Sequence, residues 1–309
     1  MAATPETFRE WIAPHVSGVR DFTTAIDASS ERHGDLPSVP SEAISERAAE
    51  ASWRGRSAWQ QPVTDTHMFG GATLRAASDY VRGVAELFGS MHPPLYAHLT
   101  LTRAALESAV VSAWLSKPGI NTAERIKRGL CELLYSANEV SLLQLDAKGP
   151  ENVEFWKAVG SSLGWTIDNS RTKPIIDGTR RPRVSDGVVE LSGSDTDARI
   201  GNLLYSRLSA VDHVTWFGLF SAFDASAAQR DDRVCTAAVP ITVDGAKVSA
   251  YLYYALKVLR AAAAARFTLM GWLDEPWAEA TARADALERR LLEIALASPP
   301  GNPTTGSQA

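Results

Sequence analysis

Apolar residues recur at steps of three and four along most of the chain, which is the spacing of amphipathic helices. Turn and capping residues mark where these helices begin and end: Pro118-Gly119 cannot continue a helix, and Asn121 with Glu124 resembles a capping box. The pattern predicts helices over residues 8–12, 41–59, 72–88, 93–116, 121–147, 151–163, 196–224, 247–270 and 276–297.

Two stretches break this pattern. Residues 165–195 show no sustained period and contain turn dipeptides such as Asp177-Gly178, which predicts a short hairpin around Val184–Leu191. Residues 234–243 are expected to be extended. We therefore expect an all-α fold, a helical bundle with a short irregular or hairpin insertion around 165–195. We expect residues 1–60 to form an N-terminal helical arm and residues 61–298 to form the bundle core. Residues 299–309 are expected to be a disordered tail.

Composition narrows the function classes. The chain has 309 residues, of which 45% are hydrophobic and 22% charged, and this excludes a disordered or collagen-like protein. Its first residues lack the segments of a signal peptide, and no apolar run approaches the roughly 18 residues of a membrane span. Cys131 and Cys235 lack the spacing of a redox or metal motif, so we expect reduced thiols and a cytoplasmic location without membrane insertion. The net charge of −5 disfavours nucleic acid as a partner.

The helix expected near residues 95–115 carries two charged residues on a largely apolar surface. Arg103 and Glu107 are four residues apart, a spacing at which they can form an ion pair. Because apolar residues lie on every side of this helix, we expect the pair to be partly buried. Two interpretations stay open: an ordinary ion pair at the rim of the core, or part of a binding site.

A later helix carries a polar stripe that continues into aromatic residues. Its members recur at steps of three and four: Asn202, Ser206, Ser209, His213, Phe217 and Phe220. We expect the stripe to be buried, because the opposite side of the helix is apolar as well. An unsatisfied buried polar group costs about 1–3 kcal/mol, so the stripe needs partners from side chains, water or a ligand. His213 beside a carboxylate would titrate near neutral pH and suit acid–base chemistry; a histidine satisfied by its neighbours is the alternative.

The segment from Tyr205 to His213 (Tyr-Ser-Arg-Leu-Ser-Ala-Val-Asp-His), followed by Trp216, resembles a set of uncharacterised actinobacterial all-helical proteins. The upstream Arg-x-x-x-Glu helix resembles an element of the same family. The likeness covers residues 70–270 and implies no activity.

Arg207 and His213 are more distantly similar to the Arg…His motif of HEPN domains, helical bundles that include metal-independent ribonucleases. This resemblance implies that His213 is an acid–base residue and that Arg207 holds the scissile phosphate. It also implies a homodimer.

Other catalytic and cofactor motifs are missing from the sequence. It has no Walker loop, no Gly-x-Ser-x-Gly elbow and no paired metal-ligand spacing, so we expect neither a metal nor another cofactor. A basic run lies at 171–183. Three interpretations of it stay open: a solvated loop, a site for a phosphate-bearing ligand or acidic partner, and a lid over the bundle.

These observations lead to a hypothesis about function. We expect a pocket for a small organic, anionic ligand, and the sequence leaves open whether acid–base catalysis accompanies binding. The expected catalytic residues are His213, Glu107 and Arg103, and the expected ligand-binding residues are Asn202, Ser206, Ser209, Arg207, Trp216, Phe217 and Phe220. A HEPN-like ribonuclease or nucleotide-binding protein is the first alternative. A non-enzymatic protein that docks a partner through residues 1–60 is the second.

Overall fold

The computed structural model describes residues 5–89, 96–143, 147–169, 173–193, 195–212, 229–231, 236–238 and 245–297. The α-helices are α1 (Pro5–His33), α2 (Glu42–Ala49), α3 (Pro62–Gly89), α4 (Ala97–Leu115), α5 (Thr122–Leu142), α6 (Gly149–Ser162), α7 (Val184–Ser192), α8 (Asp195–Asp212), α10 (Gly245–Met270) and α11 (Glu275–Ala297). A 3₁₀ turn, η1 (Glu50–Ser52), follows α2. The strands are β1 (Ile167–Asp168), β2 (Ile175–Ile176), β3 (Thr179–Arg180), β4 (Gln229–Asp231) and β5 (Thr236–Ala238). The predicted all-α bundle with a short insertion is thereby confirmed.

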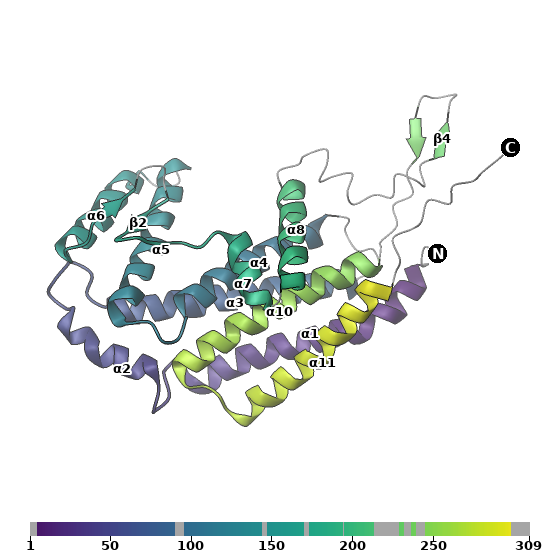
Figure 1. Ribbon diagram of the computed structural model, residues 1–309, viewed down its shortest axis with the longest axis horizontal. Helices are drawn as coiled ribbons and strands as arrows, with labels where there is room; N and C mark the ends of the chain where they lie inside the picture. Colours follow the sequence, from purple (N-terminus) through teal and green to yellow (C-terminus); the bar gives the residue numbers. More distant parts are fainter. Residues whose placement is uncertain are drawn as a thin grey trace.

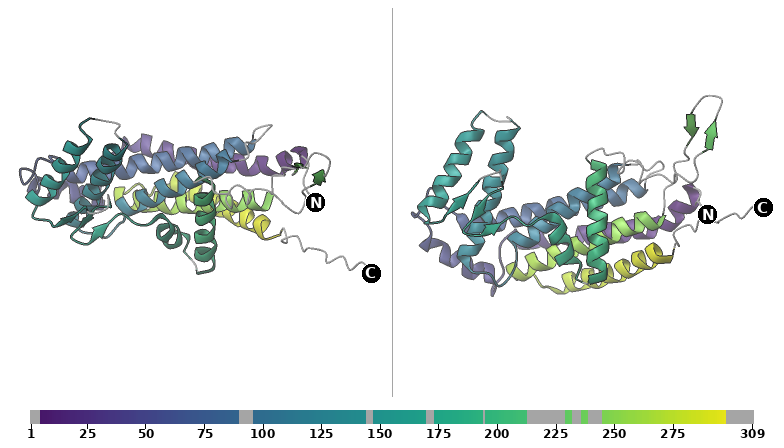
Figure 2. Two further views of the ribbon diagram at one scale, coloured as in Figure 1. Left: turned by 90° about the horizontal axis from the view of Figure 1, so that it is seen from above. Right: turned by 45° about the horizontal axis from the view of Figure 1, so that its top comes forward.

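The body of the molecule is a bundle of long helices. Figures 1 and 2 show α1, α3, α4, α10 and α11 running along the long axis, with α8 crossing them. Their apolar sides meet in one core, to which α1 contributes Val19, Phe22 and Ile26. Where a short helix over 8–12 was expected, α1 has 29 residues. The N-terminal segment is therefore part of the bundle core, and removing it would expose the apolar sides of α3 and α11.

A second, smaller core lies at one end of the bundle. It is built by α5, α6 and the antiparallel sheet β1-β2-β3 (Figure 1). Leu130 and Leu134 of α5 pack there with Val159 of α6 and Ile176 of β2. At the opposite end of the molecule, α1 begins and α11 ends.

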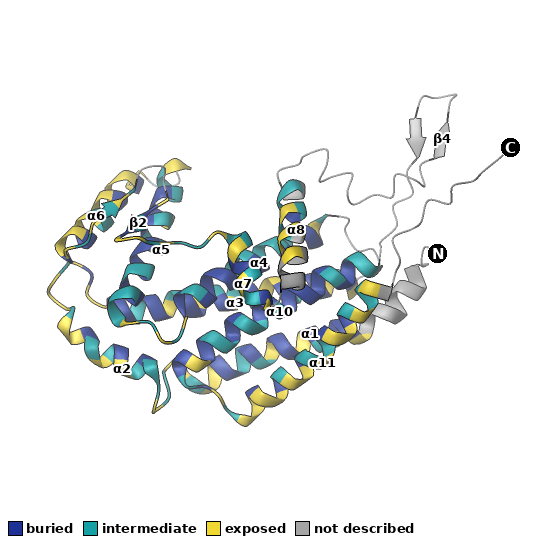
Figure 3. Cartoon of the chain, in the orientation of Figure 1, coloured by how far each residue is buried: buried dark blue, intermediate teal, exposed yellow. Residues whose placement is uncertain are grey.

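Burial follows the faces of the helices. In Figure 3, α10 is buried on nearly every side through its middle, whereas α11 keeps an exposed outer side. An apolar circumference is expected for a helix that has neighbours all round. None of the helices in the described ranges is apolar over the length that would cross a lipid bilayer.

The insertion is organised differently from the prediction. Its hairpin is β2–β3, where Asp177 and Gly178 turn the chain with φ angles of 46° and 84°. The hairpin expected around Val184–Leu191 is wrong, because these residues form α7. Val188 is fully buried in the bundle core and Val184 and Leu191 pack beside it, so the segment buries apolar residues at helical spacing.

The start of α3 also differs from the prediction. A helix was expected from residue 72, directly after Gly70-Gly71, but α3 begins at Pro62 and holds both glycines in its interior. The hydroxyl of Ser112 on α4 donates to the carbonyl of Gly70 at 2.8 Å. The missing side chain thus permits a close approach of α4 that outweighs the low helix propensity of glycine.

Capping side chains fix several helix ends. As predicted, Asn121 caps α5: its Oδ1 accepts a hydrogen bond from the backbone N–H of Glu124 at 2.8 Å. The Glu50 carboxylate caps α3 by accepting from the N–H groups of Val63 and Thr64, both at 2.9 Å. The helix expected over 41–59 is shorter than predicted, because α2 and η1 end at Ser52 and residues 53–58 form turns and bends.

Candidate functional site

The predicted pair Arg103–Glu107 lies where α8 packs against α4. Arg103 Nε donates to Glu107 Oε1 at 2.8 Å, and the hydroxyl of Tyr205 donates to the same oxygen at 2.9 Å. Burial, together with the negative charge of Glu107, raises the pKa of Tyr205 to about 12, so the phenol stays protonated at neutral pH. The two helices that the hypothesis brings together are therefore in contact through Tyr205.

The described part of that stripe does not face the interior. Asn202 and Ser206 are exposed, and Ser209 is half-buried. The hydroxyl of Ser206 donates to the carbonyl of Asn202 at 3.0 Å, so the helix backbone satisfies it. The expectation that Asn202 and Ser206 are buried is wrong, because α8 turns Leu208 and Tyr205 towards the bundle core.

The rest of the expected site falls largely outside the described residues. His213, Trp216, Phe217 and Phe220 belong to this group, and their roles stay predictions. Arg207 is half-buried, and its Nε makes no hydrogen bond with the described part of the chain. Since His213 is not described, the structure does not test the Arg–His arrangement of the HEPN resemblance.

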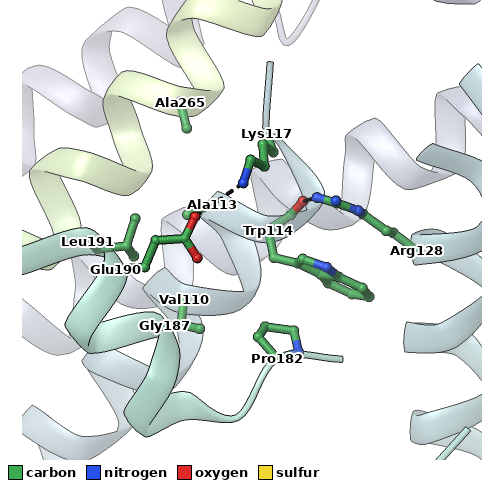
Figure 4. A pocket seen from close by; sticks show the side chains of 10 residues that line it. All are labelled: Val110, Ala113, Trp114, Lys117, Arg128, Pro182, Gly187, Glu190, Leu191 and Ala265. Carbon is green, nitrogen blue, oxygen red and sulfur yellow. Dashed lines mark hydrogen bonds and ion pairs between the residues drawn. The ribbon is translucent and has the colours of Figure 1, made fainter. Parts of the chain in front are cut away.

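A pocket opens near the C-terminal end of α4, between this helix and α7 (Figure 4). Its volume is about 140 Å³. The lining residues come from α4 and the segment after it, from α5, α7 and α10, and from the segment before α7: Val110, Ala113, Trp114, Lys117, Arg128, Pro182, Gly187, Glu190, Leu191 and Ala265. The walls are mostly apolar, and three charged side chains reach them from different elements.

Those charged groups lie on two sides of Trp114, with Lys117 and Glu190 on one side and Arg128 on the other (Figure 4). Lys117 Nζ lies 3.2 Å from Glu190 Oε1, and both side chains are well exposed. Arg128 is held from the α5 side: its Nη1 donates to the carbonyl of Trp114 at 2.6 Å, and its guanidinium lies 5.5 Å from the centre of the Trp114 ring. An aromatic surface beside Arg128, with the second cation of Lys117 in the same pocket, is suited to a flat anionic molecule.

A buried ionic network lies where the two cores meet; we call Glu42, Glu46, His67 and Arg125 the junction network. Arg125 has no exposed surface. Its Nε lies 3.1 Å from both Glu46 oxygens, its Nη1 donates to the carbonyl of Leu115 at 2.7 Å, and its Nη2 pairs with Glu42 at 3.2 Å. His67 Nε2 donates to Glu46 Oε2 at 2.7 Å.

The surroundings of the junction network set its charge state. Burial lowers the pKa of His67 below its ordinary value, although Glu46 opposes this shift. Burial by itself would raise the pKa of Glu46, but the hydrogen bond from His67 and the charge of Arg125 outweigh it and lower that pKa. At neutral pH the network therefore joins a neutral histidine to a charged Arg–Glu pair.

No family model, curated protein or solved structure matches the chain. Its function must therefore be argued from the chemistry of its own residues.

Two other kinds of site find no support in the described residues. Burial and the nearby Glu132 raise the pKa of Cys131 to about 12, so this thiol is not a nucleophile at neutral pH. Within the described ranges, no three His, Cys, Asp or Glu side chains gather closely enough to hold a metal ion.

The described part of the basic run fastens the insertion to α5. Arg181 pairs with Glu132 at 3.2 Å and lies 4.0 Å from the centre of the Tyr135 ring. Lys127 of α5 pairs in turn with Asp177 of the β2–β3 turn at 3.1 Å. These contacts give Arg181 a structural role.

Sequence reasoning missed both the pocket and the junction network. Glu46 is 21 positions from His67 and 79 from Arg125, so no periodic pattern joins them. The pocket is likewise assembled from separate segments, and the one signal within a single helix was Trp114 on the apolar surface of α4.

Proposed function

We propose that the protein binds a small aromatic carboxylate in the pocket between α4 and α7. The observation that supports this most is a mostly apolar hollow that holds the Trp114 indole and two cations, Lys117 and Arg128. The volume of about 140 Å³ is close to the roughly 150 Å³ cavity that holds benzene, so one six-membered ring fits. The proposal keeps the predicted small organic anion but places it at α4 and α7 instead of along α8.

The ligand carboxylate is proposed to bind Lys117. This lysine now pairs with Glu190, and because both side chains are exposed the pair contributes less than about 1 kcal/mol. Exchanging one carboxylate for another at Lys117 therefore costs little. Arg128 also pairs with Glu124, at 2.9 Å, so it is held in place and adds positive potential without having to move.

The ring is proposed to lie against Trp114, with Val110, Pro182 and Leu191 completing the wall. A stacked aromatic pair contributes about 0.5–1.5 kcal/mol beyond the burial of its surface. So small a contact predicts dissociation constants in the range from high micromolar to millimolar. The proposal is one of binding, and acid–base catalysis by His213 stays a prediction.

Calorimetric titration with benzoate tests this proposal. We expect saturable binding by the wild type and a dissociation constant about tenfold higher in Lys117→Met, which corresponds to the loss of about 1.4 kcal/mol. Ala265→Leu places a larger side chain in the hollow and should abolish binding. Both variants are checked for folding by circular dichroism.

Lys157→Met is the matched control, because this lysine of α6 also forms an ion pair, with Glu154 at 2.7 Å, but does not line the pocket. It should bind benzoate like the wild type. The proposal is contradicted if benzoate gives no saturable heat, or if the Lys117 and Lys157 variants bind it equally well.

A further inference from the structure

Arg266 of α10 is a buried cation without an anion beside it. The residue is 2% exposed, and its Nε and Nη1 make no hydrogen bond with any described residue. Its guanidinium lies 5.6 Å from the centre of the Trp272 ring. Arg260, on the same helix, pairs with Glu288 at 2.6 Å, so the charge of this second arginine is compensated by a carboxylate.

The nearby charges do not compensate Arg266. Arg47, Arg75 and Arg125 lie near enough to repel Arg266, whereas Asp35 attracts it. Asp35 already pairs with Arg75 at 2.7 Å. Burial lowers the pKa of Arg266 to about 9, which still leaves the guanidinium protonated at neutral pH. A buried charge without compensation destabilises the folded state strongly, so this position calls for an anion.

The surface of α3 that faces Arg266 is free of side chains. A methyl group added to Gly71 would lie 3.2 Å from Arg266 Nη2. A methyl group added to Gly70 would lie 2.6 Å from Ser116 Oγ and 3.9 Å from Arg266 Nη1. Both of these polar atoms therefore lie close to Gly70. The Ser116 hydroxyl is buried as well, and it too has no partner among the described residues. Two unpaired donors thus converge beside a pair of glycines.

We infer that Arg266 and Ser116 bind a small inorganic anion, of the size of chloride or phosphate, between α3, α4 and α10. The guanidinium offers two N–H donors in a fixed plane, and the hydroxyl of Ser116 offers a third donor. Gly70 and Gly71 let both donors lie directly against the backbone of α3, where an added methyl group would crowd them. Neither Arg266 nor Ser116 lines the pocket at Lys117, so this site is separate from the one proposed for an organic acid. The bound anion would join α10 to α3 and α4 beside the junction network.

Thermal unfolding of the full chain tests the inference. The protein is refolded from urea into sodium gluconate, whose anion is too bulky for an enclosed site, and chloride or inorganic phosphate then replaces gluconate at constant ionic strength. We expect the midpoint to rise saturably with one or both inorganic anions, by about 5 °C at one hundred times the dissociation constant. The anion with the lower half-saturating concentration is the one that the site prefers.

Two substitutions of α10 arginines separate binding from general salt effects. Arg266→Met keeps the apolar stem and removes the charge, and it should abolish the rise. Arg260→Met removes an arginine that is already paired, so it should lower the midpoint but keep the rise. If the Arg266 variant fails to fold, Ser116→Ala replaces it and should raise the half-saturating concentration about tenfold, because one hydrogen bond to the anion is lost. Equal midpoints in all three salts, or the same rise in the Arg266 or Ser116 variant as in the wild type, would overturn the inference.

Discussion

Two polar clusters of similar composition lie in different surroundings in this protein. The first, which we call the α4–α8 cluster, consists of Arg103, Glu107 and Tyr205. In it, the side chains of Arg103 and Glu107 are 17% and 37% exposed. In the junction network, those of Arg125 and Glu46 are 0% and 5% exposed. Water screens the first pair, so it contributes little to stability. In the junction network, Arg125 and Glu46 compensate each other, because an unpaired charge in the interior strongly destabilises the folded state.

The two clusters also differ in how well their ion pairs can be predicted from the sequence. Arg103 and Glu107 are four residues apart on one helix, and their pairing can be read from the spacing. Glu46 and Arg125 meet only after α2 and α5 have been brought together. The pair that is easy to predict is therefore the one that matters less for stability. Four predictions test this difference, from the largest expected effect to the smallest.

Arg125→Met should have the largest effect. It leaves Glu46 as a buried carboxylate without its cation and removes a hydrogen bond to the carbonyl of Leu115. We expect the free energy of unfolding in urea to fall by about 3–5 kcal/mol. The control is Arg20→Met, which breaks an exposed pair with Glu86 and should cost less than about 1 kcal/mol. Similar losses of unfolding free energy in the two variants would show that burial does not make the Arg125 pair more important than an exposed pair.

Acidification should weaken the junction network. The folded-state pKa of His67 lies below its ordinary value of 6.5, so below pH 6.5 the unfolded chain binds a proton that the folded chain does not. Stability should therefore fall as the pH drops below about 6.5, by up to about 1.4 kcal/mol per pH unit for this group. The pKa of Glu46 is also lowered, so its contribution is present above 4.5 and is lost as the pH falls through its folded-state pKa.

Urea unfolding between pH 5 and pH 8 measures this dependence. His67→Gln keeps a donor for Glu46 but cannot titrate, so it should flatten the curve between pH 5 and 6.5. Burial also lowers the pKa of His15, so His15→Gln is the companion variant and should retain the contribution of His67. An unchanged slope in His67→Gln would assign the acid sensitivity to other groups.

Tyr205→Phe tests the α4–α8 cluster. The substitution removes the hydrogen bond to Glu107. The Glu107 carboxylate still pairs with Arg103 and is still accessible to water. We expect a loss of about 1 kcal/mol in the free energy of unfolding, well below that of Arg125→Met. A loss as large as that of Arg125→Met would show that α8 depends on this bond as strongly as the junction depends on its arginine.

Ser206→Ala should have the smallest effect. The side chain is exposed and its hydroxyl bonds to the backbone of its own helix, so stability should change by no more than about 0.5 kcal/mol. Urea unfolding at neutral pH measures this value. A loss above 1 kcal/mol would restore the idea that the polar stripe is a structural element of the interior.

The prediction of the fold succeeded where the signal was local. The spacing of apolar residues predicted the long helices, and Asn121 predicted a helix start that the structure confirms. The Glu124 carboxylate does not complete the capping box but binds Arg128 and Thr179. The prediction failed where packing decided between local alternatives. Gly70-Gly71 predicts a helix boundary, but the close approach of α4 keeps both glycines inside α3. The segment with Val188 was expected to be extended, but the bundle core buries it as a helix.

The sequence by itself determined the helical class, several helix ends and the ion pair of Arg103 with Glu107, because each depends on residues within about two turns of one helix. The tertiary structure decided which polar groups are buried and which of them meet. Asn202 lies on a stripe that was expected to be buried, yet it is exposed. Arg266, which follows the alanine run 261–265, is buried against α3 and α4. Contacts between helices far apart in the chain set both outcomes, and periodicity within one helix carries no information about which partner covers each face.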